Sequence, residues 1–324
     1  MYKINFQKPI HIHFIGIGGI SMSGLAEILL EEGFTVSGSD AKESPLTKKL
    51  ESEGAVIHYG QCAENITDDI NCVVYTAAIN KSNPELMEAV GKKIPMLTRA
   101  ELLGQLMKNY DTPIAVSGTH GKTTTTSMIS EVLLAADMDP TISVGGILKT
   151  IGGNIRVGKS GNFITEACEY TNSFLHFYPK ISVILNIEED HLDFFKDLED
   201  IRHSFHQFSA LLPSDGTLII NGDIKDYQEI YEGLDCNVIT YGSSAEFDYS
   251  ATEIQYDEKG FVSFELLKHN TSCGRVQLSV TGDHNVSNAL AAIATAELLG
   301  IPMDTIRKGL LSFSGTDRRF EYKG

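Results

Sequence analysis

The segment 117–124, Ser-Gly-Thr-His-Gly-Lys-Thr-Thr, constrains this chain more than any other. It follows an apolar run at residues 113–116 and opens an amphipathic segment, residues 123–136, that has the pattern of a helix. A strand, a glycine loop and a helix start together make a phosphate site, because backbone N–H groups and the positive helix end converge on anionic oxygens. Lys122 is expected to reach the terminal phosphates, and the Thr123 hydroxyl to bind a magnesium ion.

The loop departs from the general Walker pattern at one position. That pattern has a glycine five residues before its second glycine, and this chain has Val116 there. A glycine turn that merely precedes a lysine is the alternative interpretation, and the strand and helix on either side argue against it. We therefore expect this loop to hold phosphate groups.

A second glycine turn lies near the start of the chain. Residues 11–15 have the pattern of a short buried strand, and the glycine-rich residues 16–24 lead into a helix that ends at Gly33. A strand over residues 34–38 follows. Asp40 then comes about twenty residues after the turn, as in a Rossmann-like unit.

This turn predicts a diphosphate site but does not indicate which diphosphate ligand it binds. Gly16, Gly18 and Ser21 have the spacing that sets a diphosphate on a helix start. Asp40 has the position of an acceptor for a ribose hydroxyl. The signal is weak by itself, since dehydrogenases and sugar-nucleotide enzymes both use it, and a purely structural turn is the alternative.

The remaining pattern predicts an α/β protein with two domains. Strands alternate with helices, which indicates parallel sheets. The pattern restarts near Pro113, so we place one domain at residues 1–110, as a Rossmann-like parallel sheet, and a second at residues 111–314, as a P-loop-type α/β domain. From residue 238 to residue 280 the apolar period changes to two, which predicts an antiparallel β appendage. Other expected elements are strands at 72–76, 162–165, 181–187 and 217–221, and helices from about residue 99 and over 285–299.

Composition and charge restrict the partners and the compartment. The chain has 324 residues, 42% of them hydrophobic and 21% charged, as in an ordinary globular protein. Its net charge of −17 repels nucleic acid and anionic lipid, so we expect neither nucleic acid nor a membrane as a partner. No long apolar span and no leader peptide are visible, which favours a cytoplasmic location. Five scattered cysteines without a C-x-x-C pair indicate reduced thiols.

Two acidic loops follow strands of the second domain. Glu169 comes after the strand at 162–165, and His191 lies in the acidic loop after the strand at 181–187. Carboxyl ends of such strands gather ligands, so both loops should project where the phosphate loop projects. Mg²⁺ prefers oxygen ligands, which makes Glu169 a candidate ligand, and His191 is a candidate for a second cation or for orienting a reacting group. A solvated surface turn is the alternative for the loop of His191.

Two asparagines open the last predicted helix. Asn285 and Asn288 lie three residues apart and therefore on one side of it. A carboxamide both donates and accepts hydrogen bonds, which suits an adenine edge. Helix capping by Asp283 or Asn285 is an equally open interpretation.

Taken in order, these segments resemble the Mur ligases, a family of ATP-dependent ligases of peptidoglycan synthesis. The resemblance covers essentially the whole chain and depends on the set of motifs rather than on any one of them. The motifs are Gly16-Ile-Gly-Gly-Ile-Ser-Met-Ser-Gly24, Gly118-Thr-His-Gly-Lys-Thr-Thr-Thr-Thr126, Glu166-Ala-Cys-Glu169, Asn186-Ile-Glu-Glu-Asp-His191, Gly282-Asp-His-Asn285 and Phe313-Ser-Gly-Thr-Asp-Arg-Arg-Phe320.

The resemblance implies a role for each domain. The first would bind a UDP-sugar, the second would bind ATP, and residues 315–324 would be a linker to a third domain. Lys122 and His191 would be catalytic, and Thr123, Glu169 and His191 would bind metal. The implied ATP-binding residues are Gly118, Thr119, His120, Gly121, Lys122, Thr123, Thr124, Asn285 and Arg319. The implied UDP-sugar-binding residues are Gly16, Gly18, Gly19, Ile20, Ser21, Asp40, Thr76 and Ala77.

The implied reaction joins L-alanine to UDP-N-acetylmuramate through an acyl phosphate, with ATP and Mg²⁺. Family members have three domains, and this chain stops a few residues after Phe320, where the third should start. We therefore expect it to bind ligands without turning over. A ligase that recycles muramoyl peptide is the alternative within the family. A nicotinamide-dependent dehydrogenase is the alternative outside it, but leaves the loop of Lys122 without a task.

Overall fold

The computed structural model describes residues 2–76 and 78–316 of the chain. The chain divides into two compact units, Met1–Asn109 and Tyr110–Gly324. The domain ranges expected from the sequence, residues 1–110, 111–314 and 315–324, stay a prediction. Each unit is an α/β structure with its own sheet, in agreement with the fold class that the alternating pattern predicts.

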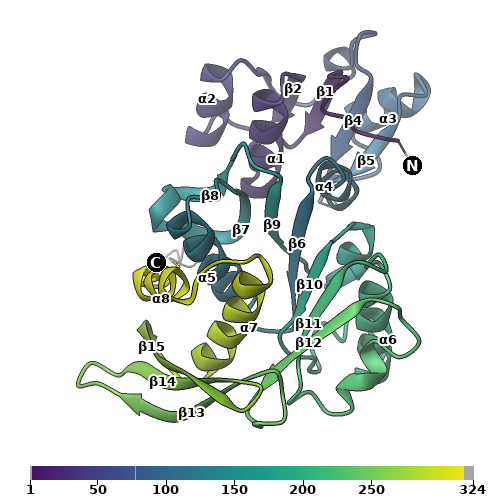
Figure 1. The fold of residues 1–324 in the computed structure, drawn as a ribbon. Helices are drawn as coiled ribbons and strands as arrows, with labels where there is room; N and C mark the ends of the chain where they lie inside the picture. The colour runs from purple at the N-terminus through teal and green to yellow at the C-terminus, as the bar shows by residue number, and fades with distance from the viewer. Residues whose placement is uncertain (1, 77, 317–324) are drawn as a thin grey trace. The chain divides into compact units, whose positions relative to one another are not determined.

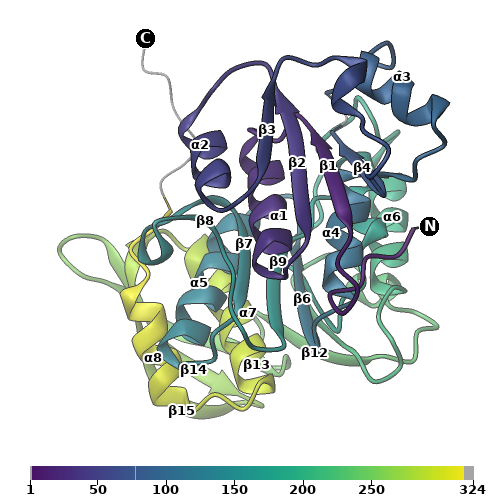
Figure 2. The same cartoon turned by 90° about the horizontal axis from the view of Figure 1, so that it is seen from above.

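The first unit alternates strands and helices: β1 (His11–Ile15), α1 (Ile20–Glu31), β2 (Thr35–Asp40), α2 (Pro45–Ser52), β3 (Val56–Tyr59), η1 (Ala63–Asn65), β4 (Cys72–Tyr75), α3 (Pro84–Gly91), β5 (Met96–Thr98) and α4 (Arg99–Met107). Its parallel sheet has the order β3-β2-β1-β4-β5. Figure 2 shows β1, β2 and β3 side by side. β1 is central, and Ile12 and Phe14 are fully buried because both faces of such a sheet are covered.

Two strands of this sheet were not predicted. β3 is an edge strand with both of its terminal residues exposed, and β5 has only three residues. Both strands are short, with four and three residues, and such short runs give a weak periodic signal. α3 has a well-defined start, because the Asn83 side chain caps it and Pro84 occupies its first position.

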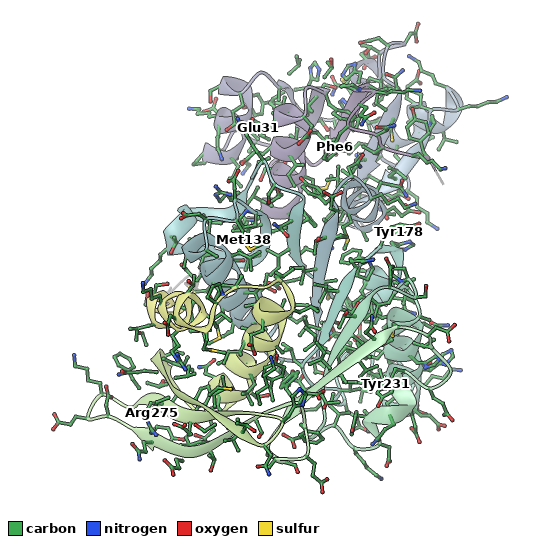
Figure 3. All side chains as sticks on the ribbon, in the orientation of Figure 1. Phe6, Glu31, Met138, Tyr178, Tyr231 and Arg275 are labelled. Carbon is green, nitrogen blue, oxygen red and sulfur yellow. The ribbon has the colours of Figure 1, made fainter. Side chains whose placement is uncertain are left out.

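The N-terminal residues belong to the packing of the first unit. Phe6, labelled in Figure 3, packs edge-on against Phe34 with ring centroids 6.2 Å apart. The side chain of Asn109 accepts a hydrogen bond from Phe6 N at 3.1 Å and donates one to Ile4 O at 3.2 Å. These bonds tie the two ends of the unit together.

The second unit begins with the strand that feeds the predicted phosphate loop. Its elements are β6 (Thr112–Ser117), α5 (Lys122–Ala135), β7 (Thr141–Leu148), η2 (Lys149–Ile151), β8 (Gly153–Arg156), β9 (Asn162–Glu166), η3 (Tyr170–His176), β10 (Ile181–Ile184), α6 (Leu198–Ser209), β11 (Thr217–Asn221), η4 (Tyr227–Ile230), β12 (Asn237–Gly242), β13 (Tyr249–Tyr256), β14 (Phe261–Lys268), β15 (Thr271–Thr281), α7 (His284–Leu298) and α8 (Met303–Ser312).

Within the described residues, these strands form one mixed sheet in the order β15-β14-β13-β12-β11-β10-β6-β9-β7-β8. The centre is parallel, and β6 lies between β9 and β10. β13, β14 and β15 pair antiparallel, as the period of two predicts. The antiparallel pairing begins one strand later than expected, because β12 pairs in parallel with both β11 and β13. The predicted appendage is therefore a continuation of the main sheet.

Helices cover both faces of this sheet. α5, α7 and α8 pack together on one face, and α6 lies on the other (Figure 1). Alternate residues of β10 divide between the faces, since Ile181 and Val183 belong to the core cluster of α5, α7 and α8, while Ile184 does not. Met138, just after α5, packs against the edge of that cluster (Figure 3). α8 was not predicted. A proline after a helix is usually a stop signal, but Pro302 is the N-cap residue of a further helix.

Across residues 2–76 and 78–316, no helix combines the length and the apolar composition that a membrane span requires. The cytoplasmic location expected from the sequence stays a prediction.

Candidate functional site

A cavity of about 800 Å³ lies in the second unit, at the edge where β6, β10 and β11 end. Ligands of open α/β sheets bind at this edge. Six of the predicted ATP-binding residues line it, and all six belong to the segment that precedes and opens α5. The lining residues are Thr119, His120, Gly121, Lys122, Thr123, Thr124, Gly145, Gly146, Leu185, Asn186, Glu188, Asn221, His284, Ser287, Asn288 and Thr316.

Two glycines let the phosphate loop (residues 118–121) close against its neighbours. Gly118 has φ +144°, and a Cβ there would lie 2.9 Å from Leu185 Cβ. Gly121 has φ +84°, and a Cβ there would lie 2.7 Å from Asn288 Oδ1. Any other residue would strain the backbone and displace a neighbour. Gly121 also caps α5 without a side chain, and the first N–H groups of such a helix attract anions.

The loop after β10 is hydrogen-bonded to the phosphate loop. Asn186 Oδ1 accepts from His120 N at 2.7 Å, and Asn186 Nδ2 donates to His120 O at 3.1 Å. Asn186 O accepts from Thr119 N at 3.2 Å, and Thr119 Oγ1 accepts from Glu188 N at 2.9 Å. The N–H groups of Thr119 and His120 are thus engaged within the protein. The start of α5 and Lys122 are among the donors that remain for an anion in the cavity.

Lys122 and Glu169 form a buried ion pair at this loop. Lys122 Nζ lies 3.1 and 2.9 Å from the two carboxylate oxygens of Glu169. It also donates to Gly118 O and, at 3.2 Å, to Thr119 O. The side chains are only 16% and 3% exposed. These contacts fix a long cationic side chain beside the cavity, as the sequence pattern requires of a phosphate-binding lysine.

The oxygen donors around Lys122 fit a magnesium ion that arrives with a nucleotide. Thr123 lines the cavity with a hydroxyl, and Glu169 supplies a carboxylate. In the part of the chain that the structure describes, no group of three or more His, Cys, Asp and Glu side chains could hold a metal by itself. Mg²⁺ needs no such group, because it keeps several waters and takes one or two carboxylates plus substrate phosphates.

His191 lies in an aromatic cluster and not in the lining of the cavity. Its ring stacks on Tyr170, with centroids 4.4 Å apart and planes at 28°. The Tyr170 hydroxyl donates to Asp193 Oδ2 at 2.8 Å. His191 has φ +53°, and its carbonyl oxygen accepts from Phe194 N and Phe195 N at 2.8 and 3.0 Å. The His191 backbone is thus strained, while stacking on Tyr170 holds its ring in a defined position. Its catalytic and metal-binding roles stay predictions.

At the start of α7, Asn288 and not Asn285 lines the cavity. Asn285 Nδ2 donates to Thr281 O at 2.7 Å, and Asn285 Oδ1 accepts from Asn288 Nδ2 at 3.1 Å. No side-chain hydrogen bond from Asp283 caps the helix, so the capping interpretation fails for that residue. The contact of Asn285 with adenine stays a prediction.

In the first unit, the end of β2 holds the glycine turn after β1. Ser39 O accepts hydrogen bonds from Gly16 N at 2.9 Å and Ile17 N at 3.0 Å. Asp40 Oδ2 accepts from Gly18 N at 2.8 Å. Asp40 therefore supports the turn itself, a role that reasoning from the sequence missed. Its predicted contact with a ribose hydroxyl stays untested.

The turn leads directly into a helix start. Gly19 is the N-cap of α1, without a side-chain hydrogen bond, and Ile20 and Ser21 begin the first turn. Ile20, in this first turn, is 43% exposed. No side chain caps this helix start, and helix starts of this kind suit an anionic ligand.

Thr76 follows β4 at the same sheet edge as this turn, because Ile15 of β1 is paired with Tyr75 of β4. Its hydroxyl oxygen accepts from Ala78 N at 3.2 Å. The two remaining predicted residues, Ala77 and Arg319, lie outside the described residues.

Several lining residues were not anticipated. Asn221 ends a strand that was predicted, so a polar residue at a strand's carboxyl end was the available signal. Gly145 and Gly146 lie within β7, which was not predicted as a strand at all. The other lining residues to which no role was assigned are Leu185, Asn186, Glu188, His284, Ser287 and Thr316.

Two family models match the chain. The Mur ligase middle domain matches residues 116–296, and the model described as Mur ligase family, catalytic domain, matches residues 11–111. Curated relatives agree. A UDP-N-acetylmuramate–L-alanine ligase from Agathobacter rectalis is 63% identical over 324 residues, and one from Lachnospira eligens is 60% identical over 325. Each alignment covers 100% of this chain and 71% of the relative.

Solved structures show the same architecture. A UDP-N-acetylmuramate:L-alanyl-gamma-D-glutamyl-meso-diaminopimelate ligase from Neisseria meningitides has a TM-score of 0.85 and 31% identity, with 96% of this chain and 100% of that chain covered. A UDP-N-acetylmuramate-alanine ligase from Thermotoga maritima has a TM-score of 0.81 and 30% identity, with 96% of this chain and 70% of that chain covered.

Proposed function

Because this chain belongs to the Mur ligase family, we propose that it is the nucleotide-binding part of a peptidoglycan ligase that joins L-alanine to UDP-N-acetylmuramate at the expense of ATP. The observation that carries the proposal is the position of Lys122, fixed at the start of α5 in the wall of a nucleotide-sized cavity. The 63% and 60% identical relatives with this activity in their names support the choice of amino acid.

The chemistry explains why such a protein needs a phosphate site. A carboxylate is a poor electrophile, and its oxygen is a poor leaving group. In the proposed reaction the carboxylate oxygen of UDP-N-acetylmuramate attacks the γ-phosphorus of ATP, and the bond to the bridging oxygen breaks to release ADP. The amine of L-alanine then attacks the acyl phosphate carbon, loses a proton, and expels inorganic phosphate as the amide forms.

Residues of the second unit would stabilise the charge in the first of these steps. Phosphoryl transfer depends on in-line positioning and on cations and N–H donors that balance negative charge on the transferred group. Lys122 and the first N–H groups of α5 are the groups placed to do this. Thr123 and Glu169 would hold Mg²⁺, which when bound neutralises phosphate charge. His191 would serve a second Mg²⁺ or the substrate carboxylate.

The first unit would bind the nucleotide-linked sugar. The glycine turn and the uncapped start of α1 suit its diphosphate, while Asp40 and Thr76 lie at the same edge of the sheet. We therefore assign residues 1–110 to the UDP-sugar and residues 111–314 to ATP, with residues 315–324 as a linker. By themselves these 324 residues, which span about 71% of the length of the relatives, should bind ligands but complete no ligation.

A second candidate is the ligation of a peptide instead of alanine. It is favoured by the TM-score of 0.85 to the ligase that takes L-alanyl-gamma-D-glutamyl-meso-diaminopimelate. Family membership leaves the dehydrogenase alternative without support.

The test is release of inorganic phosphate by the full-length enzyme, supplied with UDP-N-acetylmuramate, ATP and Mg²⁺. Release that requires L-alanine supports the proposal. Phosphate release that requires L-alanyl-gamma-D-glutamyl-meso-diaminopimelate, and does not occur with L-alanine, would establish the second candidate. If neither acceptor promotes phosphate release, both candidates are refuted.

A further inference from the structure

A buried carboxylate lies in the first unit, in contact with Ser39 at the end of β2. Glu85, in the first turn of α3, is fully buried. Its Oε2 accepts from Ser39 Oγ at 2.6 Å, and its Oε1 accepts from Asn65 Nδ2 at 2.6 Å. His13 Nε2 lies 3.7 Å from Oε1. A fully buried charge is costly unless it is paired and hydrogen-bonded, so this arrangement calls for a specific reason.

Ser39 links this carboxylate to the glycine turn. Its hydroxyl donates to Glu85, while its carbonyl oxygen receives the N–H groups of Gly16 and Ile17. The turn is pressed closely against β2, because a Cβ on Gly38 would lie 2.7 Å from Ile17 Cδ1. A shift of the Ser39 peptide would therefore move the turn with it.

We propose that Glu85 is a positioning residue for the UDP-sugar site, and that it acts through Ser39 to fix the glycine turn after β1. This inference rests on the proposed function for its ligand. Its structural part, the coupling of Glu85 to the turn, does not. Removal of the Ser39 hydroxyl should therefore be sufficient to break the coupling between Glu85 and the turn.

The electrostatics agree with a carboxylate that stays charged. Burial raises the pKa of Glu85, but the His13 ring and the hydrogen bonds from Ser39 and Asn65 outweigh it, so that the pKa lies below its ordinary value. An ionised acceptor makes a stronger bond to the Ser39 hydroxyl than a neutral one would. Glu85 can thus hold the Ser39 peptide in one place.

Amide hydrogen exchange of the 324-residue chain, without any ligand, tests the coupling. Ser39→Ala removes only the link, and Glu85→Met removes the acceptor while it keeps a long unbranched side chain. We expect exchange at residues 16–17 to become about tenfold faster in both variants, with β1 and β4 unchanged. The double variant should equal Ser39→Ala. Glu88→Gln, on the exposed side of α3, is the control and should leave exchange as in the wild type.

Calorimetric titration with UDP-N-acetylmuramate, on the same variants, tests the positioning role. Affinity should fall about tenfold in Ser39→Ala and Glu85→Met, the scale of one lost charge-assisted hydrogen bond, while affinity for ATP stays constant. The proposal would be overturned by unchanged exchange at the turn or by uniformly faster exchange throughout the unit. It would also be overturned by additive effects in the double variant or by unchanged affinity for the sugar. If the wild type fails to bind the sugar although the turn loosens as expected, the proposed function is wrong and the coupling stands.

Discussion

Lys122 Nζ lies within 3.1 Å of both carboxylate oxygens of Glu169, and the Glu169 side chain is 3% exposed. In the proposed reaction Lys122 would bind phosphate and Glu169 would bind Mg²⁺, yet here the two side chains bind each other. A phosphate would compete with the carboxylate for the lysine, and a magnesium ion would compete with the lysine for the carboxylate. Binding of nucleotide and of metal should therefore be coupled through this pair.

Replacement of Lys122 by alanine in the full-length enzyme should abolish ATP-dependent ligation. The variant loses the cation at the phosphate loop and leaves the Glu169 carboxylate buried without its partner, which costs about 3 kcal/mol of unfolding free energy. Alanine-dependent phosphate release is the measurement, with the exposed Lys225→Ala as the control. The double variant Lys122→Met/Glu169→Gln separates folding from chemistry, since it should regain stability but not activity. Near-normal turnover by Lys122→Ala would refute the assignment of Lys122.

Glu169→Gln should change how ATP binding depends on magnesium. The amide of the variant side chain no longer holds Lys122 by charge, so ATP without Mg²⁺ should bind about tenfold more tightly to the variant than to the wild type. The increase in ATP affinity that Mg²⁺ causes should largely disappear, because the carboxylate ligand is lost. Titrations with and without Mg²⁺ measure both effects.

Glu188→Gln removes a negative charge from the cavity wall without touching the lysine pair, and is therefore the control. It should keep the full gain from Mg²⁺. Equal behaviour of the two variants would mean that net charge, and not the Lys122 pair, couples metal and nucleotide.

Gly121→Ala should weaken both the fold and ATP binding. The new Cβ would lie 2.7 Å from Asn288 Oδ1, on a backbone with φ +84°. Gly152→Ala is a matched control, because Gly152 has φ +64° but nothing within 4 Å of a Cβ. The control should lose about 1 kcal/mol of unfolding free energy from backbone strain alone. Denaturant unfolding and ATP titration measure the two effects. Equal losses in the two variants would show that the close contact between residue 121 and Asn288 is unimportant.

The stability of the first unit should fall in acid through Glu85. A carboxyl group with a folded-state pKa below its ordinary value of 4.5 stabilises the fold above about that pH, and this contribution is lost as pH falls through the lowered pKa. Thermal unfolding between pH 7 and pH 3 should show a smaller acid-induced loss in Glu85→Met than in the wild type. An identical acid-induced loss in both proteins would show that Glu85 is not linked to folding in this way.

The sequence predicted well those features that are encoded locally. The strand, glycine loop and helix around Lys122 depend on residues adjacent in the chain, and so do the turn at Gly16 and the helix stop at Gly33. Each involves a glycine whose backbone geometry other residues resist. Such patterns were readable without knowledge of the sheet order.

Features that depend on the order of strands could not be predicted in the same way. The bonds of Asn186 to the phosphate loop exist because β10 lies next to β6, although 66 residues separate Asn186 from His120. The contact of Glu85 with Ser39 similarly joins a helix start to β2 across 46 residues. In both cases a polar side chain was visible, but its partner was fixed only by the fold.

The most direct test of the central claim is calorimetry of the 324-residue chain with UDP-N-acetylmuramate and with ATP–Mg²⁺. We expect two saturable one-to-one sites, with the sugar site sensitive to Ser39→Ala and the ATP site sensitive to Lys122→Ala. Absence of binding for either ligand, or loss of both sites on a single one of these substitutions, would contradict it.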